Sequence, residues 1–374
     1  MSIMRRALCA LLLVLIGLPA WAADRYWVGG TDTWNATAGT KWATSSGGAG
    51  GAAVPTASDN CFFDGNSGAV TVTGSAGNMS CLTLDATGFT GTLNLNGGNI
   101  LLAGSLTLGS AMTFTTGGAD LQFTASATIT SNGTAISSSG GGAIRFSANS
   151  ITIQLGDALT ASGSNPIGLS SFSASNTVFQ TNNHNISLRS ISAVNSGCTI
   201  TPGSSTITLL GAGTVINTIT VLTSNTATWK ITNNSATAKR WEPNSLTTWY
   251  HVWFNNNGTG AFEIGDTGTV GTLTVDTPPH TITVTAGKTI TLSTWAISGT
   301  SGNLMTLQSS SAGSAFTLSD SSGTNTCDYC SIKDSTATGG ATWNATNSTN
   351  VSGNTGWNFG GAAYAYPIIG IVVP

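Results

Sequence analysis

Short runs in which apolar residues alternate with Thr, Ser or Asn recur from about residue 70 to residue 335. Three of them are Leu82–Leu84, Leu106–Leu108 and Ile282–Val284. Alternation with a period of two is the pattern of a β-strand that has one buried face. Pairs such as Gly97-Gly98 separate the runs and supply the positive φ values that tight turns need. No segment beyond the first 23 residues shows a helical period, so the sequence predicts an all-β fold.

The spacing of the runs separates two β architectures. Runs recur roughly every 8 to 11 residues, and Leu84, Leu95 and Leu106 lie eleven residues apart. Both a β-sandwich and a β-solenoid allow this spacing, but a single sandwich rarely holds about 25 strands. We therefore expect a right-handed parallel β-helix, a β-solenoid of about a dozen coils of about 20 residues. Two or more β-sandwiches in tandem are the alternative.

The low charge of the chain fits this expectation. Only 7% of the 374 residues are Asp, Glu, Lys or Arg, and the formal net charge is -3. Because 40% of the residues are hydrophobic, a disordered chain is excluded. In a narrow coil the interior is apolar and short Thr, Ser and Asn side chains line up outside. Clustered Lys and Arg are almost absent, so we expect no nucleic-acid partner.

The first 23 residues have the layout of a secretory signal peptide. Arg5 and Arg6 precede an apolar run over residues 7–18, and Ala20-Trp21-Ala22 has the small-residue pattern of a cleavage site. The apolar run is shorter than the roughly 20 residues of a membrane span. We expect a secreted, extracellular or cell-surface protein with no transmembrane segment in the mature chain, and an uncleaved anchor is the alternative.

Five of the six cysteines remain after residue 23. Cys61 and Cys81 are expected to form a disulfide, and unpaired buried thiols are the alternative. Cys327 and Cys330 have CxxC spacing, but no second pair or nearby His completes a zinc site. Residues three apart on a strand point to opposite faces, so we expect these two not to bond to each other. The sequence predicts no metal site and no cofactor.

Bulky aromatic residues concentrate at the two ends of the mature chain. A solenoid must cover its open ends, and large aromatic side chains can close a core. We predict an N-terminal cap over 24–69, the solenoid over 70–335, and a C-terminal cap with an apolar tail over 336–374. The cap residues that support this division are Tyr26, Trp27, Trp34, Trp42, Phe62, Phe63, Trp343, Trp357 and Phe359.

The motifs at the two ends resemble those of known proteins. The opening pattern comprises Trp34-Asn35-Ala36, Trp42, Pro55, Asp59 and Phe62-Phe63, and the ending runs from Thr336 to Phe359. They resemble secreted bacterial, autotransporter-like and tailed-phage-associated β-solenoids of poorly characterised function. The resemblance implies a surface-exposed, adhesin-like or phage tail-associated rod, and it brings no catalytic residues with it.

One stretch, from Trp229 to Asp266, departs from the repeat. It holds the only two glutamates of the chain among several aromatic residues. Flat aromatic rings stack on sugar rings, and carboxylates bind sugar hydroxyls or act as an acid and base pair. The alternative is that the aromatics fill a wider coil and that Lys239-Arg240 with Glu242 forms a solvated turn. The candidate ligand-binding residues are Trp229, Trp241, Glu242, Trp249, Tyr250, Trp253 and Glu263.

These observations favour an exported, non-enzymatic structural or adhesive protein that binds a surface, a glycan or another partner. A polysaccharide-active enzyme, either a glycoside hydrolase or a lyase, is the first alternative, and no catalytic residue is assigned to it. A phage tail fibre or receptor-binding component is the second, and it predicts a trimer. A homo-oligomer also suits the apolar C-terminal tail.

Overall fold

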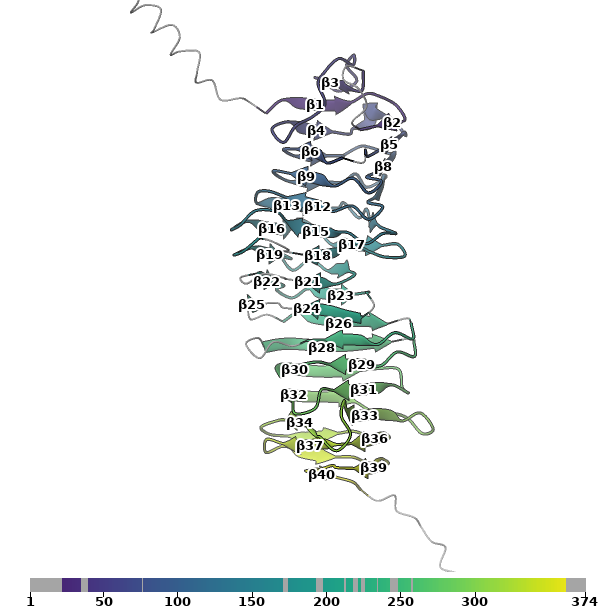
Figure 1. The fold of residues 1–374 in the computed structure, drawn as a ribbon, viewed down its shortest axis with the longest axis vertical. Coiled ribbons are helices and arrows are strands. Elements are labelled where there is room, and N and C mark those ends of the chain that lie inside the picture. Colours follow the sequence, from purple (N-terminus) through teal and green to yellow (C-terminus); the bar gives the residue numbers. More distant parts are fainter. Residues whose placement is uncertain are drawn as a thin grey trace, which may run out of the picture.

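The computed structural model describes residues 22–34, 40–75, 77–170, 174–192, 198–211, 213–217, 221–222, 226–233, 235–242, 248–256 and 258–360. In them the chain winds into an elongated stack of parallel strands, a β-solenoid of about 12 turns (Figure 1). The predicted parallel β-helix is therefore confirmed, and tandem sandwiches are excluded. Most of the predicted signal peptide and the apolar tail from residue 361 lie outside the described residues.

Three long sheets run along the stack. The first has ten strands, which pair in parallel except for the antiparallel pair β1 and β3 at the N-terminal end. In spatial order its strands are β25 (Val221–Leu222), β22 (Thr199–Thr201), β19 (Val178–Gln180), β16 (Thr152–Leu155), β13 (Ala127–Thr130), β10 (Leu106–Thr107), β7 (Leu84–Asp85), β4 (Asn60–Phe62), β1 (Asp24–Trp27) and β3 (Trp42–Ala43).

The second sheet has 14 parallel strands and extends nearly the whole length of the stack. Its strands are β2 (Asp32–Thr33), β5 (Thr71–Thr73), β8 (Thr92–Asn94), β11 (Thr113–Thr115), β14 (Ile136–Ser137), β17 (Leu159–Ser162), β20 (Ile186–Leu188), β23 (Thr206–Leu209), β26 (Thr228–Asn233), β28 (Thr248–Asn256), β30 (Gly268–Val275), β32 (Thr289–Ile297), β34 (Phe316–Ser319) and β37 (Ser335–Thr338).

The third sheet has 13 parallel strands. They are β6 (Met79–Cys81), β9 (Ile100–Leu102), β12 (Leu121–Phe123), β15 (Ala143–Phe146), β18 (Gly168–Ser170), β21 (Ile191–Ser192), β24 (Gly213–Asn217), β27 (Lys239–Trp241), β29 (Phe262–Ile264), β31 (Thr281–Val284), β33 (Met305–Ser309), β36 (Cys330–Lys333) and β39 (Thr349–Ser352). A short C-terminal sheet adds β35 (Thr324–Thr326), β38 (Thr342–Asn344) and β40 (Trp357–Asn358), and the single described helical turn is η1 (Gly65–Ser67).

The alternation in the sequence produces columns of like side chains. Leu84, Leu106 and Ile129 pair in register on β7, β10 and β13, and all three are buried. Their outward neighbours are short polar residues such as Thr107 and Thr130, which also pair in register. Because each coil repeats the pattern of the one before it, a single apolar column fills the interior along the stack.

The coil changes shape after β25, where the ten-stranded sheet ends. Before that point each full coil has one short strand in every sheet. After it, the strands of the 14-stranded sheet lengthen to nine residues in β28 and β32. In the pairing of β28 with β30, the position where Tyr250 stands opposite Gly271 is skipped, so the long strand bends there. Strands β26 to β32 therefore enclose a differently shaped interior, which the large side chains of this region fill.

Aromatic clusters close both ends of the stack, as predicted. Trp27, Trp34, Trp42 and Phe63 are fully buried, and their ring centroids lie 5.2 to 6.0 Å apart. At the other end, the ring centroids of Trp295, Trp343 and Trp357 lie 5.3 to 6.3 Å apart. Within the described residues, no helix is long and apolar enough to cross a membrane.

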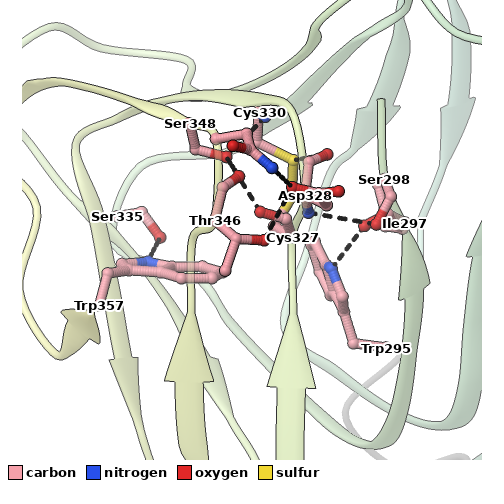
Figure 2. The surroundings of a disulfide bond; sticks show 11 residues. Trp295, Ile297, Ser298, Cys327, Asp328, Cys330, Ser335, Thr346, Ser348 and Trp357 are labelled. Carbon is pink, nitrogen blue, oxygen red and sulfur yellow. Dashed lines mark hydrogen bonds between the residues drawn. A yellow bond between two sulfur atoms is a disulfide. The ribbon is translucent and has the colours of Figure 1, made fainter. Parts of the chain in front are cut away.

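Two disulfides lie near the ends of the solenoid. Cys61 on β4 bonds to Cys81 on β6 and so joins two sheets, as expected. Cys327 also bonds to Cys330, and the expectation that they would not is wrong. The residues between them form a turn with Tyr329 at φ 50°, so the segment is not extended and the two Cα atoms lie 5.9 Å apart. Figure 2 shows this disulfide with Asp328 beside it. Cys198 is buried and takes part in neither disulfide.

Candidate functional site

Three of the predicted sugar-stacking residues lie inside the coil. Trp229 and Trp241 are 0% exposed and Trp249 is 1% exposed. Trp249 meets the other two rings edge to face, with centroids 4.8 Å from Trp229 and 5.5 Å from Trp241. No ring face is left for a ligand, so their assignment as binding residues is wrong. They fill the reshaped interior after β25, as the alternative interpretation held.

Trp253 and Tyr250, on β28, lie outside the core. Of the ten tryptophans among the described residues, nine are buried, and Trp253 alone is half-buried. Its neighbours Val252 and Phe254 are fully buried, so the Trp253 side chain points outward from the 14-stranded sheet. Tyr250, at the bend of β28, is 52% exposed.

Polar contacts hold Trp253 in place. The indole Nε1 donates a hydrogen bond of 2.9 Å to Oδ2 of Asp276, which also accepts one of 2.9 Å from Asn255 Nδ2. On the preceding coil, Lys230 pairs in register with Trp253, and its Nζ lies 4.3 Å from the centroid of the Trp253 ring. We call Lys230, Tyr250, His251, Trp253 and Asp276 the Trp253 patch.

His251 lies beside Trp253 on the same face, with its ring parallel to the indole within 4°. Its Nε2 lies 2.9 Å from Thr274 Oγ1, and its Nδ1 lies 3.4 Å from Thr228 Oγ1. Burial lowers the pKa of His251 from its ordinary value, which favours the neutral imidazole. The imidazole is thus fixed between hydroxyl groups of the two neighbouring coils.

The two glutamates lie elsewhere, on the 13-stranded sheet. Glu263 points outward from β29 between two buried residues, and Glu242 directly follows β27. Arg240 contacts both of them: its Nε bonds to Glu242, and its Nη1 lies 3.4 Å from Glu263 Oε2. The hydrogen bond to Glu242 raises the pKa of Arg240. Trp253 and Tyr250, which lie outside the core, and the two glutamates therefore occupy different sheets, and Trp241, although it is on the sheet of the glutamates, is buried. The structure does not bring the predicted set into one groove.

The predicted solvated turn at Lys239 is wrong. Lys239 is 2% exposed and occupies an inward position of β27, in register with the buried Phe262. The reason is the alternation of β27, since Lys239 and Trp241 share its inner face while Arg240 takes the outer one. Its Nζ donates a hydrogen bond of 3.2 Å to the carbonyl oxygen of Leu210, and burial lowers its pKa to about 8.

Lys239 reaches a cavity of about 430 Å³, which we call the corner cavity. Arg189 also lines it, and among the described residues no aspartate or glutamate does. Neither cation was singled out from the sequence as a site residue, although a lysine two residues before a core tryptophan on a strand is a signal that it points inward. Among the described residues, no group of three or more His, Cys, Asp or Glu side chains is placed to hold a metal ion.

Comparisons of the chain with known protein families, with curated proteins and with solved structures found no match.

Proposed function

We propose that this protein is an exported, non-enzymatic β-solenoid that attaches to carbohydrate on a surface through the Trp253 patch. The observation that carries the proposal is the placement of Trp253 outside the core while the other nine described tryptophans are buried. A half-buried indole on the outer face of a sheet contributes nothing to the packing of the apolar interior. On the outer face of a sheet it offers a flat apolar surface of the kind on which a sugar ring stacks.

The groups around Trp253 suit a carbohydrate ligand. Asp276 fixes the indole through its Nε1, so little side-chain freedom is lost when a sugar binds. Lys230 adds a cationic donor beside the ring, and Tyr250 adds an exposed phenol on the same strand, β28. The neighbouring outward positions carry Thr272 and Thr274, whose short side chains leave the sheet flat enough for an extended chain to lie on it.

The placement of the glutamates favours binding over hydrolysis. Glycoside hydrolysis commonly needs two carboxyl groups on either side of the scissile bond, one of them protonated. Glu242 and Glu263 both contact Arg240, and they do not share a sheet with Trp253. A phage fibre gains no specific support from these contacts.

A glycan array probed with the exported protein tests the proposal. We expect binding to at least one surface polysaccharide and a loss of about tenfold or more in affinity for Trp253→Ala. Leu101→Ala is the matched control, because it removes a half-buried outward apolar side chain from a different sheet. Absence of binding by the folded protein, or equal binding by Trp253→Ala, refutes the proposal. Release of oligosaccharide would instead support the polysaccharide-active alternative.

A further inference from the structure

The corner cavity lies where the chain passes from the 14-stranded sheet to the 13-stranded sheet. Four successive coils contribute to its wall: Asn165 after β17, Arg189 after β20, Leu210 after β23, and Thr232 at the end of β26. Lys239, the first residue of β27, enters from the interior of the coil. A site built from four adjacent coils has its geometry set by the stacking of the solenoid rather than by one loop.

Several hydrogen-bond donors at this cavity lack acceptors. Lys239 Nζ carries three donor hydrogens, and its one acceptor among the described residues is the Leu210 carbonyl. Arg189 Nε and Thr232 Oγ1 are buried and have no partner. Within the described part of the chain, the one acceptor for Arg189 Nη1 is Asn165 Oδ1, at 3.4 Å. Buried polar groups are normally paired, so these unpaired donors mark the place where an acceptor is missing.

The charge of the cavity is also uncompensated. Lys239 and Arg189 are the two charged residues that line it, and neither takes part in an ion pair within the described part of the chain. Burying a cation is costly unless a counter-charge accompanies it. The neighbour of Lys239 on the preceding coil is Gly213, which has no side chain to shield the ammonium group. The missing acceptor is therefore an anion.

We propose that the corner cavity binds an acidic sugar, with the sugar's carboxylate held between Lys239 and Arg189. A volume of about 430 Å³ lies in the range of about 300 to 1,000 Å³ typical of small-molecule sites. Beside the two cations, Ser164, Asn165 and Thr232 offer hydroxyl and amide groups that match sugar hydroxyls. An arginine beside a lysine suits a carboxylate, since the guanidinium can bind both of its oxygens.

This site is distinct from the Trp253 patch and does not depend on the proposed function. The two are close in the fold, because β26 carries both Lys230, which contacts Trp253, and Thr232, which lines the cavity. The residues that would hold the carboxylate are nevertheless not those of the patch. Substitutions at Trp253 and at Lys239 therefore separate the two proposals.

Calorimetric titration of the full exported protein tests the inference. The probes are glucuronic acid and N-acetylneuraminic acid at pH 7, with glucose as the neutral analogue and acetate as a free carboxylate. We expect an acidic sugar to bind, glucose to bind far more weakly, and Lys239→Met and Arg189→Gln each to weaken binding by about ten- to a hundredfold. Lys333→Met is the matched control on an outward position of the same sheet, and Trp253→Ala should also leave this binding unchanged.

The pH dependence gives a second readout. Because the pKa of Lys239 is lowered to about 8, affinity should fall as the pH rises through 8. Lys239→Met should remove that dependence, and circular dichroism confirms that the variant is folded. The inference is overturned if neither acidic sugar binds, if acetate binds as tightly as the sugars, or if folded Lys239→Met and Arg189→Gln keep the affinity.

Discussion

The two disulfides differ in the length of chain that they close, and this predicts a difference in how much each contributes to stability. Cys61 and Cys81 are separated by 20 positions, whereas Cys327 and Cys330 are separated by 3. A cross-link stabilises mainly by removing conformations from the unfolded chain, and longer loops lose more of them. All four cysteines are 0% exposed, so replacing either pair by alanine removes similar buried atoms.

The chain-entropy relation gives the magnitudes. A loop of 20 residues corresponds to about 3.3 kcal/mol of unfolding free energy at 25 °C, and a loop of 3 residues to about 1.6 kcal/mol. We expect the double variant Cys61→Ala with Cys81→Ala to lose about 1.7 kcal/mol more than Cys327→Ala with Cys330→Ala. Because the buried atoms lost are alike, the cavity contributions largely cancel in this difference.

Urea unfolding followed by tryptophan fluorescence measures both losses. Each coil contacts mainly its neighbours, so hydrogen exchange should place the effect of the first double variant in the coils near β4 and β6. Equal losses for the two double variants, or a larger loss at Cys327 and Cys330, would refute the reasoning. An increase in exchange spread evenly along the solenoid would contradict the local effect.

Three further outcomes follow from single side chains. Gly98→Ala should lower the unfolding free energy, measured by urea titration, by more than about 2 kcal/mol, because the new Cβ would lie 2.0 Å from a carbonyl oxygen of the preceding coil. A Cβ at the adjacent Gly97 would meet nothing within 4 Å, so Gly97→Ala should lower it by only about 1 to 2 kcal/mol, because of the positive φ at that position. Trp249→Ala should lower the unfolding free energy by about 3 to 5 kcal/mol, and Trp253→Ala by less than half of that, because only the first is fully buried. Lys239→Met should be more stable than the wild type at pH 7, with an unfolding free energy higher by about 1 kcal/mol or more. The Lys239 ammonium group binds its proton less tightly in the folded protein than in the unfolded chain, so the unfolding free energy of the wild type should rise between pH 8 and about 10.5. A difference in unfolding free energy between the two proteins that stays constant over that range would contradict the inward placement of a charged Lys239.

The sequence was sufficient for the architecture because alternation and turn chemistry are local signals. Each run such as Leu106–Leu108 encodes its own inward face, and the caps are visible as clusters of tryptophan. Which side chains meet across coils is not local. Trp253 and Glu263 are ten positions apart in the chain, yet the corner between β28 and β29 places them on different sheets. Proximity in the sequence therefore suggested a groove that the fold does not form.

The position of Lys239 was also not predicted from the local sequence. Its charge argued for a solvated turn, whereas the alternation with Trp241 argued for an inward position, and the packing of Trp241 decided the outcome. Arg189 lies about 50 positions earlier and reaches the same cavity because two coils separate β20 from β26. Only the register of the stack brings the two cations together.

The stacking of coils along one axis also determines how the protein would respond to force. If the two ends are pulled apart, the strands lie across the direction of the force. The hydrogen bonds between neighbouring coils then break one coil at a time, starting from the end of the stack. Leu106 pairs in register with Ile129 on the next coil, so one coil has about 23 residues. Each coil adds about 4.8 Å to the length of the folded stack, whereas its residues when fully extended span about 75 Å. Cys61–Cys81 would hold its own coil closed under such a load. A protein built this way would yield in steps and lengthen greatly before it broke, as an extensible tether does.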